Sequence, residues 1–320
     1  MERQPLRILF MGTPDFAVPT LEALIQGPDE IIAVVTQPDR PKGRGRKLVP
    51  PPVKVVAEKY GIDLYQPKAL RSAEFITTLK SYDPDLIVVA AYGKILPETI
   101  IELPRHGCIN VHGSLLPRHR GAAPIQWSII KGDAEVGVTI MQMDKGMDTG
   151  NILMKASITP DPDETSGTLF PKIARLGSHT LMDTLDMLAQ GGLAMIDQDE
   201  KQATSAPMLR KEDGLIDWSR SAREIHCLMR GLDPWPTAFS YLDGRKFQLF
   251  GPEVVHQGST RKPGTLLRAD REGLLIAAGD TCLLIKDIKM EGKRRMAVAD
   301  FLNGWPLEPG SVFGPQSDQS

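Results

Sequence analysis

Short apolar runs alternate with longer amphipathic segments between residues 6 and 190, and this alternation constrains the fold more than any other feature. The apolar runs have the length and β-branched content of buried strands and lie at 6–11, 31–35, 85–91, 108–112, 137–143 and 152–158. Helices are predicted at 16–26, 51–60, 72–81, 97–103, from 121 onwards and at 168–190. Strands that alternate with helices favour parallel βαβ units. We therefore expect an α/β domain at 1–190, with a Rossmann-like, doubly wound, mostly parallel sheet.

The sequence changes character near residue 207. Turns rich in glycine, aspartate and basic residues separate short apolar runs at 238–242, 247–250, 264–267, 274–277 and 282–288. This pattern is typical of a small antiparallel barrel. We expect a smaller C-terminal β-barrel (OB-like) domain at 207–315, a linker at 191–206 and a disordered polar tail at 316–320.

Composition and missing motifs exclude several classes of protein. The 320 residues are 41% hydrophobic and 24% charged, as is usual for a globular protein. The three cysteines form no CxxC pair, so no zinc site and no disulfide framework is predicted. The first strand–helix turn carries only Gly12, so the dinucleotide fingerprint is missing, as are the P-loop, GxSxG and HExxH motifs. With no apolar stretch long enough for a membrane span and no signal-peptide pattern, we expect a cytoplasmic, monomeric protein without metal or membrane partner.

The stretch CINVHGSLLPRHRGAAPIQ, residues 108–126, contains the strongest chemical signal. Asn110 and His112 alternate with apolar residues, so they project from one side of a predicted strand at its carboxyl end, where α/β sheets bind ligands. A second segment, MDKGMDTG at 143–150, adds Asp148 between two glycines that permit a tight turn. We expect the two segments to meet because both should end strands at the same edge of the sheet.

These three residue types suit attack of an amine on a one-carbon acyl group. The Asn110 amide can donate to an oxygen that gains negative charge. A neutral His112 can accept a proton, and the Asp148 carboxylate can orient or stabilise that imidazole. Each residue alone also has an ordinary interpretation, as a strand cap, a surface histidine or a turn aspartate. A serine hydrolase triad through Ser114 is disfavoured, since a serine two residues after the histidine should point away from it.

The combined motifs resemble the folate-dependent formyltransferases, in which Asn110, His112 and Asp148 match the catalytic set. The resemblance implies 10-formyltetrahydrofolate as formyl donor and no metal. It also implies contacts to the folate from three loops. Their residues are Tyr92, Gly93, Ile95 and Leu96; Ser114, Leu115, Leu116 and Pro117; and Met143 and Asp144.

Nearly the whole chain resembles the branch of that family whose acceptor is methionyl initiator tRNA, through RILFMGTPDFAVPTLEAL, QPDRPKGRGRKL, LDPWPTAF and EGKRRM. The loop DRPKGRGRK, at 39–47, carries five cations on flexible glycines and suits a phosphate backbone, although a solvated surface loop has the same composition. The cations expected to bind tRNA are Arg40, Lys42, Arg44, Arg46 and Lys47, extended by Lys293, Arg294 and Arg295 in the C-terminal domain.

The implied product is N-formylmethionyl-tRNA for translation initiation. His112 and Asp148 remain alternatives for the base, and His112 is also expected to donate to the oxyanion. Three rivals stay open, namely a formyltransferase for an amino sugar nucleotide, a 10-formyltetrahydrofolate hydrolase, and a non-catalytic RNA- or folate-binding protein. None of the catalytic rivals gives a reason for the basic loop at 39–47.

Overall fold

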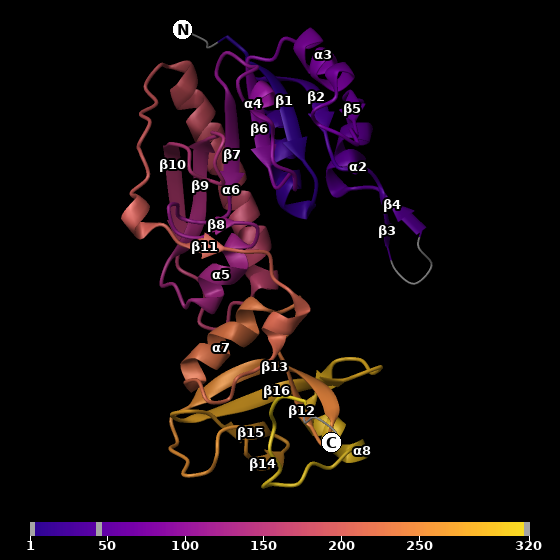
Figure 1. Cartoon of the computed structure of the whole chain (residues 1–320), viewed down its shortest axis with the longest axis vertical. Coiled ribbons are helices and arrows are strands. Elements are labelled where there is room, and N and C mark those ends of the chain that lie inside the picture. The colour runs from indigo at the N-terminus through magenta and orange to yellow at the C-terminus, as the bar shows by residue number, and fades with distance from the viewer. Residues whose placement is uncertain (1–3, 43–46, 317–320) are drawn as a thin grey trace. The chain divides into compact units, whose positions relative to one another are not determined.

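The computed structural model describes residues 4–42 and 47–316 of the chain, so the tail at 317–320 lies outside the described residues. The chain divides into two compact units (Figure 1). The first unit comprises residues 1–124, 135–158 and 170–206, and the second comprises residues 125–134, 159–169 and 207–320. Residues 191–206, which the sequence suggested as a linker, therefore belong to the first unit.

A seven-stranded sheet forms the centre of the first unit. Its strand order is β10-β9-β7-β6-β1-β2-β5. The strands are β1 (Arg7–Gly12), β2 (Glu30–Val35), β5 (Leu64–Tyr65), β6 (Leu86–Ala90), β7 (Cys108–His112), β9 (Val136–Gln142) and β10 (Ile152–Ile158). The five neighbouring strands β7, β6, β1, β2 and β5 pair in parallel, whereas β9 and β10 are antiparallel to their neighbours. The predicted Rossmann-like, mostly parallel sheet is confirmed.

Helices cover this sheet, as expected for parallel strands joined by crossovers. In the first unit they are α1 (Val18–Gln26), α2 (Pro52–Lys59), α3 (Ala73–Ser81), α4 (Glu98–Ile101) and, from residue 170, α6 (Ser166–Ala189), with a short 3₁₀ turn at Asp15–Ala17. The chain also forms α5 (Pro124–Ile130), which belongs almost entirely to the second unit, and a 3₁₀ turn at Glu200–Gln202. The α3 helix begins where the Ser72 hydroxyl accepts a hydrogen bond from the Phe75 amide at 3.3 Å. The helix expected from Gly121 begins only at Pro124, because β8 (Arg120–Gly121) pairs in parallel with β11 (Ser205–Ala206).

Helix α6 covers one face of β7, and we call the opposite face, on which Asn110 is half-buried, the open face. A Cβ atom at Gly177 would lie 2.7 Å from Cγ1 of Val111 and 3.3 Å from Cγ2 of Val138. The helix therefore packs closely on the side of β7 that carries Val111. Asn110 and His112 alternate with Val111, so they project from the opposite face.

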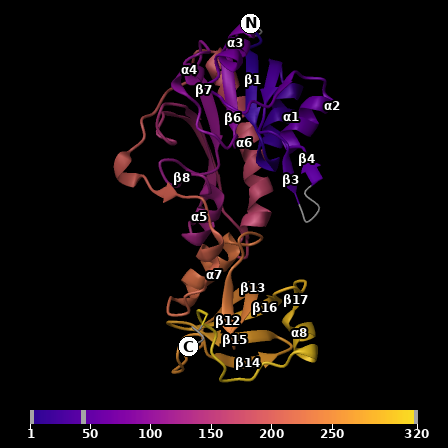
Figure 2. The ribbon, with the colours of Figure 1, turned by 45° about the vertical axis from the view of Figure 1, so that its right-hand side comes forward.

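The basic segment predicted as an irregular loop is a hairpin with a fixed base. Its strands are β3 (Arg40–Lys42) and β4 (Lys47–Val49), which pair with each other outside the main sheet (Figure 2). The Lys54 ammonium lies 2.9 Å from the Asp39 carboxylate, and the Gln66 side chain donates to Asp39 at 2.8 Å. These hydrogen bonds lower the pKa of Asp39, so the one acid of the segment holds the base of the hairpin.

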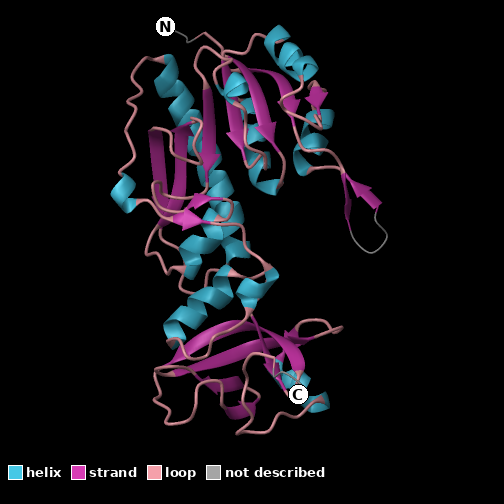
Figure 3. Ribbon diagram, viewed as in Figure 1, coloured by secondary structure: helices cyan, strands magenta, loops and turns pink. Residues whose placement is uncertain are grey.

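The second unit is a curled antiparallel sheet in the order β12-β13-β16-β15-β14, with β17 beside β16 (Figure 3). The strands are β12 (Phe239–Leu242), β13 (Arg245–Val255), β14 (Leu266–Asp270), β15 (Gly273–Ala277), β16 (Cys282–Met290) and β17 (Met296–Ala297). The sequence analysis missed two helices here, α7 (Ala222–Gly231) and α8 (Val298–Gly304), and a 3₁₀ turn at Lys211–Gly214.

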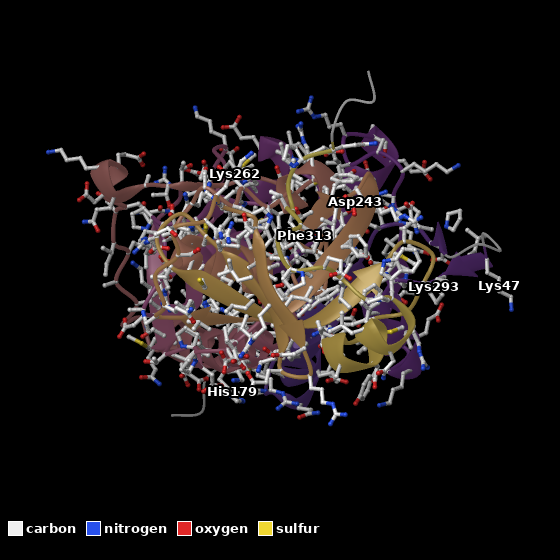
Figure 4. The ribbon with its side chains drawn as sticks, turned by 90° about the horizontal axis from the view of Figure 1, so that it is seen from below. Lys47, His179, Asp243, Lys262, Lys293 and Phe313 are labelled. Carbon is white, nitrogen blue, oxygen red and sulfur yellow. The ribbon has the colours of Figure 1, made fainter. Side chains whose placement is uncertain are left out.

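The C-terminal segment closes this sheet into the predicted small barrel. Backbone bridges join Tyr241 to Gly314 and Thr265 to Val312, so the segment lies between β12 and the start of β14. Phe313 of this segment points into the core (Figure 4), where its ring centroid lies 6.2 Å from that of Phe247. These bridges satisfy backbone donors and acceptors at Tyr241 and beside Thr265, on the two edges of the sheet.

Candidate active site

Asn110 and His112 lie on the open face of β7, as their spacing predicted. His112 is buried, with 5% of its surface exposed. Asn110 is half-buried, and within the described part of the chain its side-chain amide has no hydrogen-bond partner. The Asn110 amide is therefore available to a ligand.

Asp148 reaches this face by a different route from the one the sequence suggested. Strand β9 is antiparallel to β7, with Gln142 paired to Ile109, so β9 ends beside the start of β7. The expectation that both segments end at the same edge is wrong. The loop after β9 folds back along the sheet, close enough that a Cβ atom at Gly150 would lie 1.8 Å from the Gln142 carbonyl oxygen. Only glycine permits this close approach.

The returning loop places the Asp148 carboxylate against His112. Oδ2 of Asp148 lies 3.7 Å from Nδ1 of His112 and accepts a hydrogen bond from the Gly121 amide at 2.8 Å. Asp148 has a φ of 56°, in the left-handed region that is rare for residues other than glycine. The predicted catalytic set is thus brought together, with the backbone at Asp148 in a strained conformation.

The hydrogen bonds of His112 assign its two ring nitrogens. Nε2 lies 3.0 Å from the carbonyl oxygen of His119. A carbonyl oxygen can only accept, so Nε2 carries a proton and donates it to this bond. In the neutral ring Nδ1 is then unprotonated and faces Asp148. The Ser114 hydroxyl donates to the Arg118 carbonyl at 2.7 Å, which agrees with the exclusion of a serine triad.

The segment Ser114–Pro117 is pinned to the sheet beside the catalytic set. Thr139 of β9 donates its hydroxyl proton to the Ser114 carbonyl at 2.7 Å and accepts from the Leu116 amide at 3.0 Å. The Lys155 ammonium donates to the Leu116 carbonyl, and burial lowers the pKa of Lys155. This segment is therefore a rigid wall.

The ten residues expected to contact the folate divide by exposure. The buried residues are Tyr92, Leu96, Ser114, Leu116 and Pro117. The half-buried residues are Leu115 and Met143, and the exposed residues are Gly93, Ile95 and Asp144. Tyr92 and Leu96 belong to the same core cluster, and Met143 packs against this cluster. Burial raises the pKa of Tyr92 to about 12, and its hydroxyl has no hydrogen-bond partner among the described residues. The exposed members therefore present their surface to solvent, whereas the buried members lie in the core.

The basic hairpin presents cations to solvent wherever the structure describes it. Arg40 and Lys47 are exposed, and the backbone of Lys42 pairs with that of Lys47. Arg44 and Arg46 lie outside the described residues. The hairpin therefore carries its cations on a short ribbon.

The three predicted cations of the second unit differ from one another. Lys293 and Arg294 are exposed and, among the described residues, have no acidic partner. Arg295 lies 3.0 Å from the Asp233 carboxylate and 2.8 Å from that of Asp287. Its guanidinium also stacks 4.2 Å from the centroid of the Phe250 ring. Two carboxylates already neutralise Arg295.

Comparison with known proteins identifies the group to which this chain belongs. The family described as Formyl transferase matches residues 6–185, and the one described as Formyl transferase, C-terminal domain, matches residues 208–306. The chain belongs to the formyltransferase family. It is 60% identical to the methionyl-tRNA formyltransferase of Desulfotalea psychrophila over 98% of this chain and 97% of that protein. It is 49% identical to the methionyl-tRNA formyltransferase of Geobacter sulfurreducens over 97% of each chain.

Solved structures share the formyltransferase fold at low sequence identity. An N-formyltransferase from Helicobacter canadensis, in complex with folinic acid and dTDP-3-aminofucose, has a TM-score of 0.66 at 15% identity and covers 91% of this chain and 100% of its own. HypX from Aquifex aeolicus, in complex with tetrahydrofolic acid, has a TM-score of 0.62 at 17% identity over 93% of this chain and 47% of its own. At these identities the likeness concerns the fold alone.

The site loops carry apolar surface, since Ile95, one of the residues expected to contact the folate, is 80% exposed, and Met147, beside Asp148, is 62% exposed. Sequence reasoning missed Gln198 and Arg120. Gln198 and Arg120 form hydrogen bonds around the Asp148 loop. No local pattern indicates such long-range contacts. In the described ranges 4–42 and 47–316 no cluster of His, Cys, Asp or Glu could hold a metal ion, and no helix there is long and apolar enough to cross a membrane.

Proposed function

We propose that this chain transfers the formyl group of 10-formyltetrahydrofolate to the α-amino group of methionyl initiator tRNA, as a cytoplasmic monomer. The observation that carries the proposal is the convergence of Asn110, His112 and Asp148 on one sheet face. The full-length identity to methionyl-tRNA formyltransferases supports the acceptor. The three cysteines are buried and unpaired, which suits a reducing compartment.

The chemistry begins with the neutral amine attacking the formyl carbon, which turns the carbonyl oxygen into an oxyanion. The unpaired amide of Asn110 donates to this oxygen. Collapse of the tetrahedral intermediate breaks the bond from the formyl carbon to N10 of the folate. The attacking nitrogen loses one proton and N10 gains one, so the residues need only move a proton between them.

His112 is better suited than Asp148 to accept that proton. Its Nε2–H is engaged by the His119 carbonyl, which leaves Nδ1 as the free base. Once protonated, Nδ1 carries positive charge 3.7 Å from the Asp148 carboxylate, which stabilises the imidazolium. A donor role of His112 toward the oxyanion, one of our expectations from the sequence, then requires the protonated ring.

The folate donor would bind on the open face, against the wall at Ser114–Pro117. Exposed Ile95 and Met147 supply apolar surface for a planar ring, and the main chain of exposed Gly93 can approach a ligand closely. Buried Tyr92 and Leu116 would shape the site without direct contact. Residues of this chain thus bind and orient the donor, while the folate itself carries the formyl group.

The tRNA would contact the basic hairpin and the second unit through its phosphates. Of the three cations predicted in the second unit, Lys293 and Arg294 are exposed without an acidic partner among the described residues, whereas Arg295 supports their loop through Asp233 and Asp287. An amino sugar nucleotide would need neither set of cations. That acceptor is therefore the less favoured alternative.

Replacing Lys293 and Arg294 together by alanine is expected to raise KM for tRNA by roughly tenfold and to leave kcat unchanged, because phosphate contacts contribute to binding and not to the chemical step. Steady-state kinetics at several salt concentrations measure both constants. The dependence of log KM on log salt should also become less steep, by roughly one unit per lost phosphate contact.

Lys262→Ala is the matched control for this pair. Lys262 is also an exposed cation of the second unit, but it lies well away from Lys293 (Figure 4). It should leave KM and the salt dependence unchanged. Equal effects of the control and the double variant would contradict a localised tRNA surface.

Transfer of a labelled formyl group from the donor to methionine tests the proposed function. The protein is mixed with 10-formyltetrahydrofolate labelled in the formyl group and with methionyl initiator tRNA, and the label on methionine is measured. We expect label on the amine only when both substrates are present. Release of labelled formate without an acceptor would instead support the hydrolase, and binding without any product would support the non-catalytic alternative.

A further inference from the structure

The segment at 196–206, here called the strap, belongs to the first unit and runs from the start of β10 to β8 (Figure 1). Ile196 exchanges two backbone hydrogen bonds with Ile152, at 2.8 and 2.9 Å. At the other end, strand β11 pairs with β8. Between these ends the strap is fixed to the site by side chains, chiefly that of Gln198.

Gln198 uses both ends of its amide group. Its Nε2 donates to the carbonyl oxygens of Asp148 at 2.9 Å and of Gly150 at 2.7 Å. Its Oε1 accepts from Nε and Nη2 of Arg120 at 3.1 and 2.8 Å. The Gln198 side chain therefore holds the carbonyl groups of Asp148 and Gly150 together.

Arg120 completes a closed ring of contacts around Asp148. Its guanidinium is 12% exposed and lies 2.7 Å from the Glu200 carboxylate, which raises the pKa of Arg120. The residue that follows, Gly121, donates its amide to Asp148 Oδ2 at 2.8 Å. Strand β8 thus holds Asp148 in two ways. Gly121 binds its carboxylate directly, and Arg120 holds Gln198, which binds its backbone carbonyl.

This ring explains how a strained backbone persists at Asp148. A non-glycine residue with a φ of 56° returns to a relaxed conformation unless its surroundings prevent this. The two hydrogen bonds donated by Gln198 fix the peptide units that follow Asp148 and Gly150. The position of the carboxylate relative to Nδ1 of His112 depends on those peptide units.

We infer that Gln198 is a positioning residue for the reaction, which holds Asp148 at its working distance from His112. The inference rests on the proposed function, since it assigns Asp148 the task of stabilising the His112 imidazolium. Without Gln198, the loop relaxes and the carboxylate moves. Misplacement of a catalytic group by about 1 Å lowers turnover by roughly 10²-fold.

The test compares Gln198→Leu and Gln198→Glu with the control Gln202→Leu. Gln202 lies on the same strap and is exposed, and among the described residues its side chain donates only to Asp199. The glutamate variant keeps size and an acceptor for Arg120, but it sets a carboxylate against the carbonyls of Asp148 and Gly150. We expect both Gln198 variants to lower kcat by roughly ten- to a hundredfold with KM for tRNA and donor within about twofold, and the control to match the unmodified chain.

A second readout is independent of the acceptor and separates this inference from the proposed function. Amide hydrogen exchange in peptides covering residues 144–151 should accelerate in both Gln198 variants and not in the control. Unchanged kcat together with unchanged exchange in a folded Gln198→Glu protein would overturn the inference. If the unmodified chain transfers no formyl group while the exchange responds as expected, the proposed function fails and the structural role of Gln198 stands.

Discussion

Asn110→Ala is expected to lower kcat for formyl transfer by about 10²–10³-fold, equivalent to about 2.7–4 kcal/mol, with little change in KM for either substrate. The Asn110 amide projects from the open face of β7 and has no partner among the described residues. We therefore expect its hydrogen bond to form with the substrate and to strengthen as the formyl oxygen gains charge. Steady-state kinetics on the purified variant measure the effect.

Asn110→Asp separates donation from simple packing. Aspartate keeps the shape of asparagine but presents only acceptors at neutral pH. A negative charge beside the developing oxyanion should make this variant at least as slow as Asn110→Ala. If Asn110→Asp retained normal turnover, Asn110 would not be the oxyanion donor.

Replacing His112 by asparagine is expected to lower kcat by about 10²–10⁴-fold, the range typical for loss of a general base. Asparagine places a polar atom near the position of Nδ1 but cannot accept a proton at neutral pH. The buried ring also fills space beside Ser114, so thermal unfolding of the variant must be measured alongside its turnover.

His179→Asn provides the matched control for His112. His179 is exposed on helix α6 of the same unit, so its replacement should change neither turnover nor stability. Turnover of a folded His112→Asn variant within about threefold of the unmodified chain would show that the substrate amine needs no base from His112.

Periodicity was sufficient to predict the sheet because each central strand is buried over almost its whole length. Strand β7 matches its predicted bounds at 108–112, and the alternation along it correctly set Asn110 and His112 on one face. The helix starts were less certain, since pairing of β8 with β11 delays α5 to Pro124. Such pairing joins residues 85 positions apart, Arg120 with Ser205, which no local pattern reports.

The same limit applies to the catalytic set. Its members could be named from motifs, but the route by which the chain brings Asp148 to His112 could not be predicted. That route depends on the direction of β9 relative to β7, which follows from long-range pairing. Gln198 escaped notice for the same reason, and so did the pairing of Arg295 with two carboxylates. Their roles depend on partners such as Asp148 and Asp287 that only the folded chain brings near.

Acceptor discrimination tests the central claim most directly. With 10-formyltetrahydrofolate as donor, kcat/KM is measured in parallel for methionyl initiator tRNA, methionyl elongator tRNA and a dTDP-linked amino sugar. We predict efficient transfer to the initiator tRNA, much weaker transfer to the elongator and none to the sugar. Preferred transfer to the sugar would contradict the assigned acceptor and the proposed role of the basic hairpin, while leaving the chemistry of Asn110, His112 and Asp148 in place.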